Sequence, residues 1–274
     1  MATVEQLGAP DEKALTSLLA REPIRNLHLL GLLNDFLQGG KNLEVHGCRS
    51  GEVITAAVWV DRPRGRVLPT AGGNPDEFRA IAEHLKPGLQ LGSIVGDKTA
   101  VEPLEEALAN GRPRLHYLHR IFWVGPDHLG PYLQPRLRCA LPADLPQLFP
   151  LAINGFCEAF GAEPDSSGVE LLKRQIEQNV LEGRTYVLES EGKLVFKADV
   201  AWKSPHGAEI SGLYTAQDHR HRGHATLGLG QLSRQLLSGL PRLTLRGNEA
   251  VSRVALNVGY ERRPEVQLLV TQGG

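Results

Sequence analysis

The sequence has few cysteines and no surplus of charge of either sign. Cys48, Cys139 and Cys157 are an odd number at wide spacing, which is typical of free thiols in a reducing compartment and argues against a disulfide framework or a zinc site. The 30 Lys and Arg residues are balanced by 31 Asp and Glu residues. We therefore expect no nucleic-acid partner, because nucleic-acid binding needs an excess of positive charge to neutralise phosphates.

Long hydrophobic runs are missing as well. A membrane-spanning helix needs about 18 consecutive apolar residues, whereas the best run, 27–33, is shorter and contains His28. The opening MATVEQLGAP lacks the basic start and apolar stretch of a signal peptide. We therefore expect a cytoplasmic protein without a membrane partner.

What is present is enough apolar material for a packed core. Of 274 residues, 41% are hydrophobic, which fits one large domain or two ordinary ones. The segment 125–138 is rich in proline and glycine and is typical of a linker. We therefore expect two domains, 1–128 and 129–274.

Periodicity predicts the same order of elements in both halves: a pair of helices, three strands, a helix, a strand, a helix and a strand. In the first half we expect helices over 11–20, 24–37, 75–85 and 100–109, and strands over 43–46, 53–60, 67–69, 89–95 and 116–124. In the second half we expect helices over 142–156, 169–180, 224–237 and 249–257, and strands over 137–140, 185–188, 194–202, 208–215, 243–246 and 265–270. We therefore expect the fold class to be α/β (α+β).

The segment most informative about chemistry runs from 208 to 237, where a strand is followed by a loop and then by a helix. The loop reads R-H-R-G-H-A over 220–225. A helix N-terminus presents backbone N–H groups without partners at the positive end of the helix dipole, which suits a phosphate or pyrophosphate. Gly223 allows close approach of the backbone, and Arg220 and Arg222 add positive charge.

This loop resembles the Arg/Gln-x-x-Gly-x-Gly/Ala loop of the GNAT superfamily of N-acetyltransferases, which holds the pyrophosphate of acetyl-CoA. A second block, N-E-A-V-S-R-V-A-L-N-V-G-Y over 248–260, resembles the family's Asn-x-x-Ala-x-x-Leu-Tyr-x-x-x-Gly-Phe signature. Val251 and Val254 depart from it, standing where the signature has Ala and Leu. The resemblance covers roughly 136–270 and implies two GNAT-like domains, each a mixed, mostly antiparallel twisted sheet flanked by helices.

The first half resembles a degenerate copy, as in tandem proteins of this superfamily. After Thr70 the chain reads Ala-Gly-Gly-Asn-Pro-Asp-Glu and has no Arg-x-x-Gly-x-Ala loop. Asp76 and Glu77 place negative charge where a phosphate would lie. We therefore expect the first half not to bind CoA.

The resemblance also implies roles for single residues. The backbone N–H of Leu213 would face the acetyl carbonyl as an oxyanion donor, which strengthens as charge develops in the transition state. Cofactor-binding residues would be Leu213, Tyr214, Thr215, Arg220, His221, Arg222, Gly223, His224, Ala225, Thr226 and Asn248. Asn248 has a second possible role, capping the helix that follows it.

Two positions, 209 and 255, bear on acid and base catalysis. Glu209 stands eleven positions before Arg220, as the base does in the histone-acetylating branch, and it is either a general base for the amine or a solvent-facing strand residue. Strand alternation places it on one face with Leu213 and places Tyr214 on the opposite face. The family's usual acid, a tyrosine, is Ala255 here.

Histidines and acidic residues near these motifs have plainer interpretations. His219, His221 and His224 have no clean metal-ligand spacing, so we expect phosphate-loop side chains and no metal. The acidic loop 158–165 is either a solvated loop or a rim for a cationic acceptor.

The resemblance implies an acetyl-CoA-dependent N-acetyltransferase acting on a primary amine of a small molecule or peptide, with a homodimer possible. One alternative is a non-catalytic CoA-binding regulatory module, motivated by Ala255 and the degenerate first half. The other is an interaction scaffold that binds no CoA.

Overall fold

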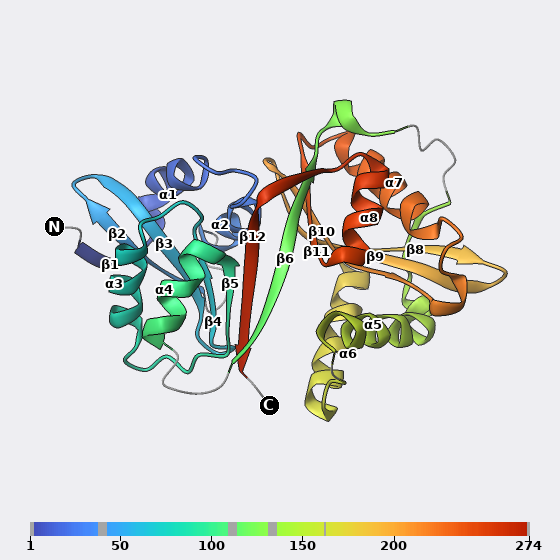
Figure 1. The fold of residues 1–274 in the computed structure, drawn as a ribbon, viewed down its shortest axis with the longest axis horizontal. Helices are drawn as coiled ribbons and strands as arrows, with labels where there is room; N and C mark the ends of the chain where they lie inside the picture. The colour runs from blue at the N-terminus through green and yellow to red at the C-terminus, as the bar shows by residue number, and fades with distance from the viewer. Residues whose placement is uncertain (1–2, 38–42, 109–113, 131–135, 162, 273–274) are drawn as a thin grey trace. The chain divides into compact units, whose positions relative to one another are not determined.

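The structure is a computed structural model that describes residues 3–37, 43–108, 114–130, 136–161 and 163–272 (Figure 1). Contacts divide the chain into two compact units. The first unit consists of 1–121 and 263–274, and the second unit consists of 122–262. Each is a mostly antiparallel sheet flanked by helices, so the predicted fold class is confirmed.

The elements up to residue 124 follow in the order β1 (Thr3–Leu7), α1 (Glu12–Leu19), α2 (Leu27–Leu37), β2 (Leu43–Ser50), β3 (Val53–Asp61), β4 (Arg66–Pro69), α3 (Pro75–Leu85), β5 (Ser93–Asp97), α4 (Lys98–Leu108) and β6 (Arg114–Val124). After them come β7 (Arg138–Cys139), α5 (Leu145–Phe160), α6 (Ser166–Leu181), β8 (Thr185–Ser190), β9 (Lys193–Ser204), β10 (Gly207–Thr215), α7 (His224–Leu237), β11 (Leu243–Gly247), α8 (Glu249–Val258) and β12 (Glu261–Gln272). Short 3₁₀ turns precede several of the helices.

The two series have the same order, a strand, two helices, three strands, a helix, a strand, a helix and a strand, which confirms the predicted internal repeat. β1, which pairs antiparallel with β2, is not among the strands predicted from the sequence. The strand predicted over 89–95 begins only at Ser93. Of the predicted linker 125–138, residues 131–135 lie outside the described residues.

The last strand distinguishes the contact-based units from the predicted domains, 1–128 and 129–274. Residues 267–271 of β12 pair antiparallel with β5, and Leu268 and Val270 are buried in the core of the first unit. Most of β12 therefore belongs to the first unit by its contacts. A strand's own pattern indicates that it is a strand but does not specify its neighbour, so this placement could not be read from the sequence.

The sheet of the second unit places β10 between β9 and β11. One face carries a core shared with α7 and α8, and the other face carries a core shared with α5 and α6. β10 runs antiparallel to β9 and parallel to β11. The parallel ladder covers only Ala208–Ile210 against Leu243–Leu245, so the carboxyl half of β10 is not part of this ladder.

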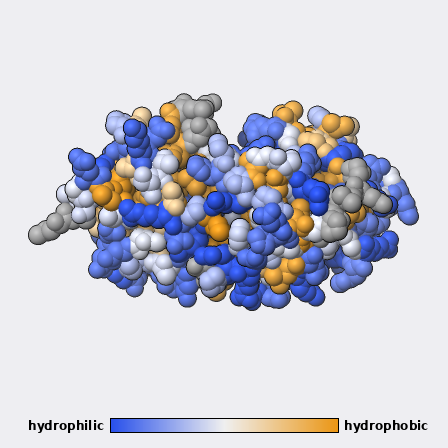
Figure 2. Space-filling view, turned by 90° about the horizontal axis from the view of Figure 1, so that it is seen from above, coloured by the Kyte–Doolittle hydropathy of each residue, from blue (hydrophilic) through white to orange (hydrophobic). Residues whose placement is uncertain are grey.

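Two expectations about the whole chain can be compared with the structure. All three cysteines are free thiols, as predicted, and burial raises the pKa of Cys48 to about 11. Among the described residues, no helix has both the length and the apolar character required to cross a membrane. On the face drawn in Figure 2, hydrophobic residues occur in separate groups among hydrophilic ones.

Candidate active site

The carboxyl half of β10 is bulged. Ser211 pairs with Asp199 and Tyr214 pairs with Lys197, so Gly212 and Leu213 together oppose a single residue of β9. Gly212 has φ +59°, a left-handed conformation that glycine adopts without steric cost. A glycine in this conformation is the first residue of one common type of β-bulge, which bends the strand and interrupts its ladder.

The bulge reverses the predicted faces of the strand. Ala208 and Ile210 pack in the core beside α7 and α8, and after the bulge Leu213 packs there too. Tyr214 packs in the core beside α5 and α6. The expectation that Glu209 and Leu213 share one face, with Tyr214 on the other, is therefore wrong. Regular alternation holds only along an uninterrupted strand.

The N-terminus of α7 is open. Gly223 is its N-cap residue with φ 81°, and no side chain among the described residues caps the helix there. A Cβ at Gly223 would meet no described atom within 4 Å. The first N–H groups of α7 therefore lack intrahelical partners and are accessible to an anion.

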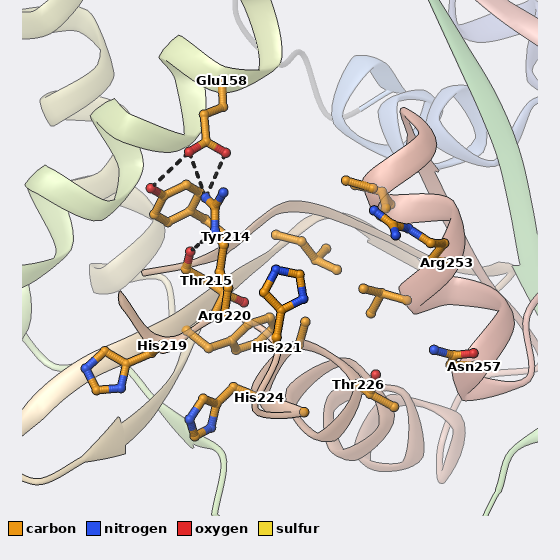
Figure 3. A pocket seen from close by; sticks show the side chains of 17 residues that line it. Glu158, Tyr214, Thr215, His219, Arg220, His221, His224, Thr226, Arg253 and Asn257 are labelled. Carbon is orange, nitrogen blue, oxygen red and sulfur yellow. Dashed lines mark hydrogen bonds and ion pairs between the residues drawn. The ribbon is translucent and has the colours of Figure 1, made fainter. Parts of the chain in front are cut away.

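A cavity of about 520 Å³ joins this helix end to the bulged strand (Figure 3). It is lined by Leu213, Tyr214 and Thr215 of β10, by His219, Arg220, His221 and Gly223 of the loop, and by His224, Ala225 and Thr226 of α7. Glu158 of α5, Phe196 of β9 and Ala250, Val251, Arg253, Val254 and Asn257 of α8 complete the lining. The cavity thus brings most of the predicted cofactor residues together.

Arg220 does not point freely into this space. Its Nη2 lies 2.7 Å from both carboxylate oxygens of Glu158, and its Nε donates to the carbonyl of Thr215 at 3.1 Å. The guanidinium also lies over the ring of Tyr214, 5.3 Å from its centre. Figure 3 shows Glu158, Tyr214 and Arg220 pointing toward one another at one side of the cavity. Glu158, the first residue of the predicted acidic loop, therefore forms an ion pair with Arg220 beside the cavity.

Burial and charge make His224 a weak base. Partial burial lowers its pKa below 6.5, and the positive charges of His219, Arg222 and Arg136 lower it further. The rings of His219 and His224 lie 6.2 Å apart. Within the described part of the chain, no cluster of His, Cys, Asp or Glu could hold a metal ion. His224 is therefore neutral at pH 7, and its protonation would add a positive charge to the cavity.

Three predicted site residues do not line the cavity. Asn248 caps α8, where its side chain accepts hydrogen bonds from the backbone N–H groups of Ala250 and Val251. Arg222 follows His221, which has φ 60°, and the side chain of Arg222 does not line the cavity. Glu209 is buried, and its carboxylate lies 3.0 Å from Nη2 of Arg246. The solvent-facing alternative for Glu209 is therefore wrong.

The cavity residues of α8 and Phe196 of β9 are not among the predicted site residues. The positions 250, 254 and 257, and likewise 253 and 257, follow helical spacing and form one side of a helix. This spacing inside the second motif could have indicated a wall of the cavity. Phe196 reaches the cavity because Gly228 of α7 lies directly against its ring.

We expect Gly228→Ala to destabilise the protein, although alanine favours helix by about 1 kcal/mol over glycine. A Cβ at 228 would overlap the fully buried ring of Phe196. Overpacking of this kind costs about 1–3 kcal/mol, measurable by urea unfolding. The same substitution should cost less in a Phe196→Leu background, and an equal cost in both backgrounds would contradict this explanation.

Comparison with known proteins gives likenesses in structure alone. No family profile and no curated protein matches the sequence. A GCN5-related N-acetyltransferase from Sphaerobacter thermophilus superposes with a TM-score of 0.62 at 14% identity, covering 99% of this chain and 95% of that one. A GNAT-family acetyltransferase from Colwellia psychrerythraea has a TM-score of 0.56 at 12% identity, covering 99% and 100%.

A tandem GNAT protein from the clavulanic acid biosynthesis pathway is also similar along its whole length. Its TM-score is 0.55 at 12% identity, and the match covers 100% of this chain and 99% of that one. Identities this low establish a shared fold and leave activity open. Both the order of elements and these likenesses show that the chain has the fold of GNAT acetyltransferases.

Proposed function

We propose that this protein is an acetyl-CoA-dependent N-acetyltransferase that acetylates a primary amine of a small molecule or peptide. The observation that carries the proposal is the cavity that runs from the bulge of β10 to the uncapped N-terminus of α7. One end of it offers strand backbone to a thioester, and the other offers helix N–H groups to phosphates.

The residues present fit CoA in shape and charge. The first turn of α7, with Gly223, His224 and Ala225, would hold the pyrophosphate, and Arg253 adds positive charge from α8. Phe196, Val251 and Val254 give an apolar wall for the chain between phosphate and sulfur. Arg220 is bound to the carboxylate of Glu158 and to the carbonyl of Thr215. We therefore assign Arg220 the structural role of holding the loop in place.

Acetyl-CoA supplies an acetyl group activated as a thioester. In the net reaction an ammonium ion and acetyl-CoA give an amide, the free thiol and one proton, with a C–N bond formed and a C–S bond broken. The N–H of Leu213 is assigned as the donor to the carbonyl oxygen as negative charge develops there. Much of the rate would come from orientation of thioester and amine in one cavity.

We do not assign the base role to Glu209, because its carboxylate is buried in an ion pair outside the cavity. Glu158 brings a carboxylate to the cavity wall at the side of Tyr214, whose hydroxyl lies 3.5 Å from it. Burial and the charge of Glu158 raise the pKa of Tyr214, so its hydroxyl keeps its proton at neutral pH. An amine approaching from this side would meet Glu158.

Two measurements test the proposal. Saturating CoA at about 100 times Kd should stabilise the fold by roughly 2.7 kcal/mol in a thermal or chemical unfolding assay. Acetyl-CoA with a panel of primary amines should release free thiol. No stabilisation by CoA would overturn the proposal and its CoA-binding alternative together.

A CoA-binding regulatory module is the second candidate. Ala255 is fully buried at the position of the family's usual acid tyrosine, so no side chain there can protonate the leaving thiolate. Tight CoA binding without thiol release on any amine of the panel would favour this candidate over catalysis.

We propose that the first unit does not bind CoA. Its helix α3 is the counterpart of α7, but Asn74 caps it by accepting from the N–H of Asp76, and Glu77 accepts from the N–H of Asn74. The N–H groups that would hold a phosphate are therefore occupied, and two carboxylates lie in the first turn. Titration calorimetry should give one CoA per chain, whereas two would contradict this assignment.

CoA binding should be linked to proton uptake at His224. In the free protein its pKa is lowered, so the ring is neutral at pH 7, and a nearby phosphate would raise the pKa again. The affinity for CoA should therefore increase as the pH falls through the pKa of His224 in the CoA complex. It should level off below the pKa of His224 in the free protein. Calorimetry at pH 6–6.5 in buffers of different ionisation enthalpy measures the uptake, which His224→Gln should reduce.

A further inference from the structure

A buried charged cluster lies directly beneath the bulge of β10. Nζ of Lys197 lies 2.6 Å from Oδ2 of Asp199 and 3.0 Å from the carbonyl oxygen of Gly212. The other carboxylate oxygen of Asp199 accepts from the hydroxyl of Thr185 at 2.6 Å. Lys197 is 4% exposed and Asp199 9% exposed, and neither lines the cavity. A buried ammonium requires such partners because its desolvation is costly.

The carbonyl that Lys197 holds belongs to a particular peptide group. The C=O of Gly212 and the N–H of Leu213 are two ends of one planar peptide, and the described chain has no cis peptide bond. In a trans peptide these two groups point in opposite directions. Fixing the carbonyl therefore fixes the direction of the N–H that the proposed function assigns as the oxyanion donor.

The faces of the sheet agree with this direction. Phe196 lies in the core beside α7 and α8 and lines the cavity, and its neighbour Lys197 lies on the opposite face because strand residues alternate. The carbonyl of Gly212 is thus held toward the α5 and α6 side. The N–H of Leu213 is directed toward the side of Phe196, where the cavity lies.

We propose that Lys197, held by Asp199, is a positioning residue for acetyl transfer: it anchors the Gly212–Leu213 peptide so that the Leu213 N–H points at the acetyl carbonyl. This inference rests on the proposed function. The ammonium acts in two ways. It fixes the orientation of the peptide before substrate binds, and its charge polarises the peptide so that the N–H becomes a stronger donor.

Gly212 is required for this arrangement. A Cβ at 212 would overlap the Asp199 carboxylate and lie 2.8 Å from Nζ of Lys197, and φ +59° is strained for other residues. Gly212 on β10 therefore leaves the space that Lys197 and Asp199 on β9 occupy. The anchored donor needs no reorganisation when charge develops, which is the feature that makes such donors effective.

The test replaces the ion pair by apolar residues of similar size, because removing one partner alone would leave a buried charge. Buried pairs replaced in this way often keep or gain stability. In Lys197→Met/Asp199→Leu, CoA should bind within about twofold of its affinity for the unmodified protein by calorimetry. With an amine that the unmodified protein acetylates, kcat should fall by about tenfold, less than the 10²–10³ lost when an oxyanion donor is removed outright.

Infrared difference spectra with acetyl-CoA carrying ¹³C at the thioester carbonyl give a readout independent of the acceptor. In the unmodified protein the carbonyl band should lie at lower wavenumber than in free acetyl-CoA, because the donor polarises it. The double variant should lose at least half of this displacement. Thr185→Val is the matched control, since it perturbs Asp199 and leaves Lys197 on Gly212, and should keep the displacement in full.

The outcomes separate this inference from the function on which it rests. If CoA does not bind the unmodified protein, the proposed function fails. If acetyl-CoA binds and the carbonyl band is the same in the unmodified protein and the double variant, or is not displaced in either, the inference about Lys197 is overturned while CoA binding stands.

Discussion

Arg246→Ala is expected to lower the free energy of unfolding by about 3–5 kcal/mol, the usual cost of leaving one charge of a buried ion pair without its partner. Arg246 on β11 pairs with Glu209 on β10 at 3.0 Å, and their side chains are 13% and 8% exposed. Burial lowers the pKa of Arg246, and the charge of Glu209 offsets this lowering only in part. Urea unfolding monitored by circular dichroism measures the loss.

Glu209→Leu/Arg246→Met is the matched control. It removes both charges and keeps the volume, so it should cost much less than Arg246→Ala alone. A loss under 1 kcal/mol for Arg246→Ala, or an equal loss for the double variant, would contradict the view that the pair is buried and mutually dependent.

Glu209→Gln tests the role that spacing indicates for this residue. A general base predicts a fall in kcat of about 10²–10⁴ with CoA affinity nearly unchanged. From its burial beside Arg246 and its place outside the cavity, we expect instead a loss of stability with kcat at saturating substrates changed by less than that range. An unaltered rate removes Glu209 from the mechanism, and a fall within the range would restore it as the base.

Ala225→Asp should weaken CoA binding by about ten- to a hundredfold, which corresponds to about 1.4–2.8 kcal/mol. Ala225 lies in the first turn of α7 and lines the cavity. A carboxylate there would repel phosphate, yet it favours the helix dipole, so the fold should be at least as stable as before. Calorimetric titration with CoA and urea unfolding measure the two effects separately.

Ala225→Asn is the control, because asparagine has the shape of aspartate without its charge. It should keep most of the CoA affinity. Equal losses in both variants would mean that size and not charge decides, and unchanged affinity in Ala225→Asp would place the phosphates elsewhere.

Much of the fold could be predicted because it depends on local patterns. The apolar spacing of 224–237 predicts α7 with the bounds that the structure has, and the same periodicities predict the repeat of elements. The phosphate-loop candidates are neighbours along the chain, so a motif of six residues brings most of them to one wall of the cavity.

The wall contributed by α5 could not be read in this way. Arg220 and Glu158 are 62 positions apart, and their ion pair depends on how α5 packs on the sheet. Leu213 lies on the face of Phe196, and Tyr214 on the face of α5 and α6, because Gly212 adds a residue to β10 and reverses every face after it. The sequence contains the glycine but gives no sign that it occupies a bulge.

The sequence by itself determined the order of helices and strands, the open phosphate loop before α7 and the capped counterpart before α3. These follow from backbone preferences and short-range hydrogen bonds within a few residues. Only the tertiary structure decided that Glu209 lies in an ion pair with Arg246, that Lys197 holds the peptide of Gly212, and that β12 joins the first unit. Such contacts depend on strand register and pairing, and a one-residue change in either moves a side chain to the other face of the sheet.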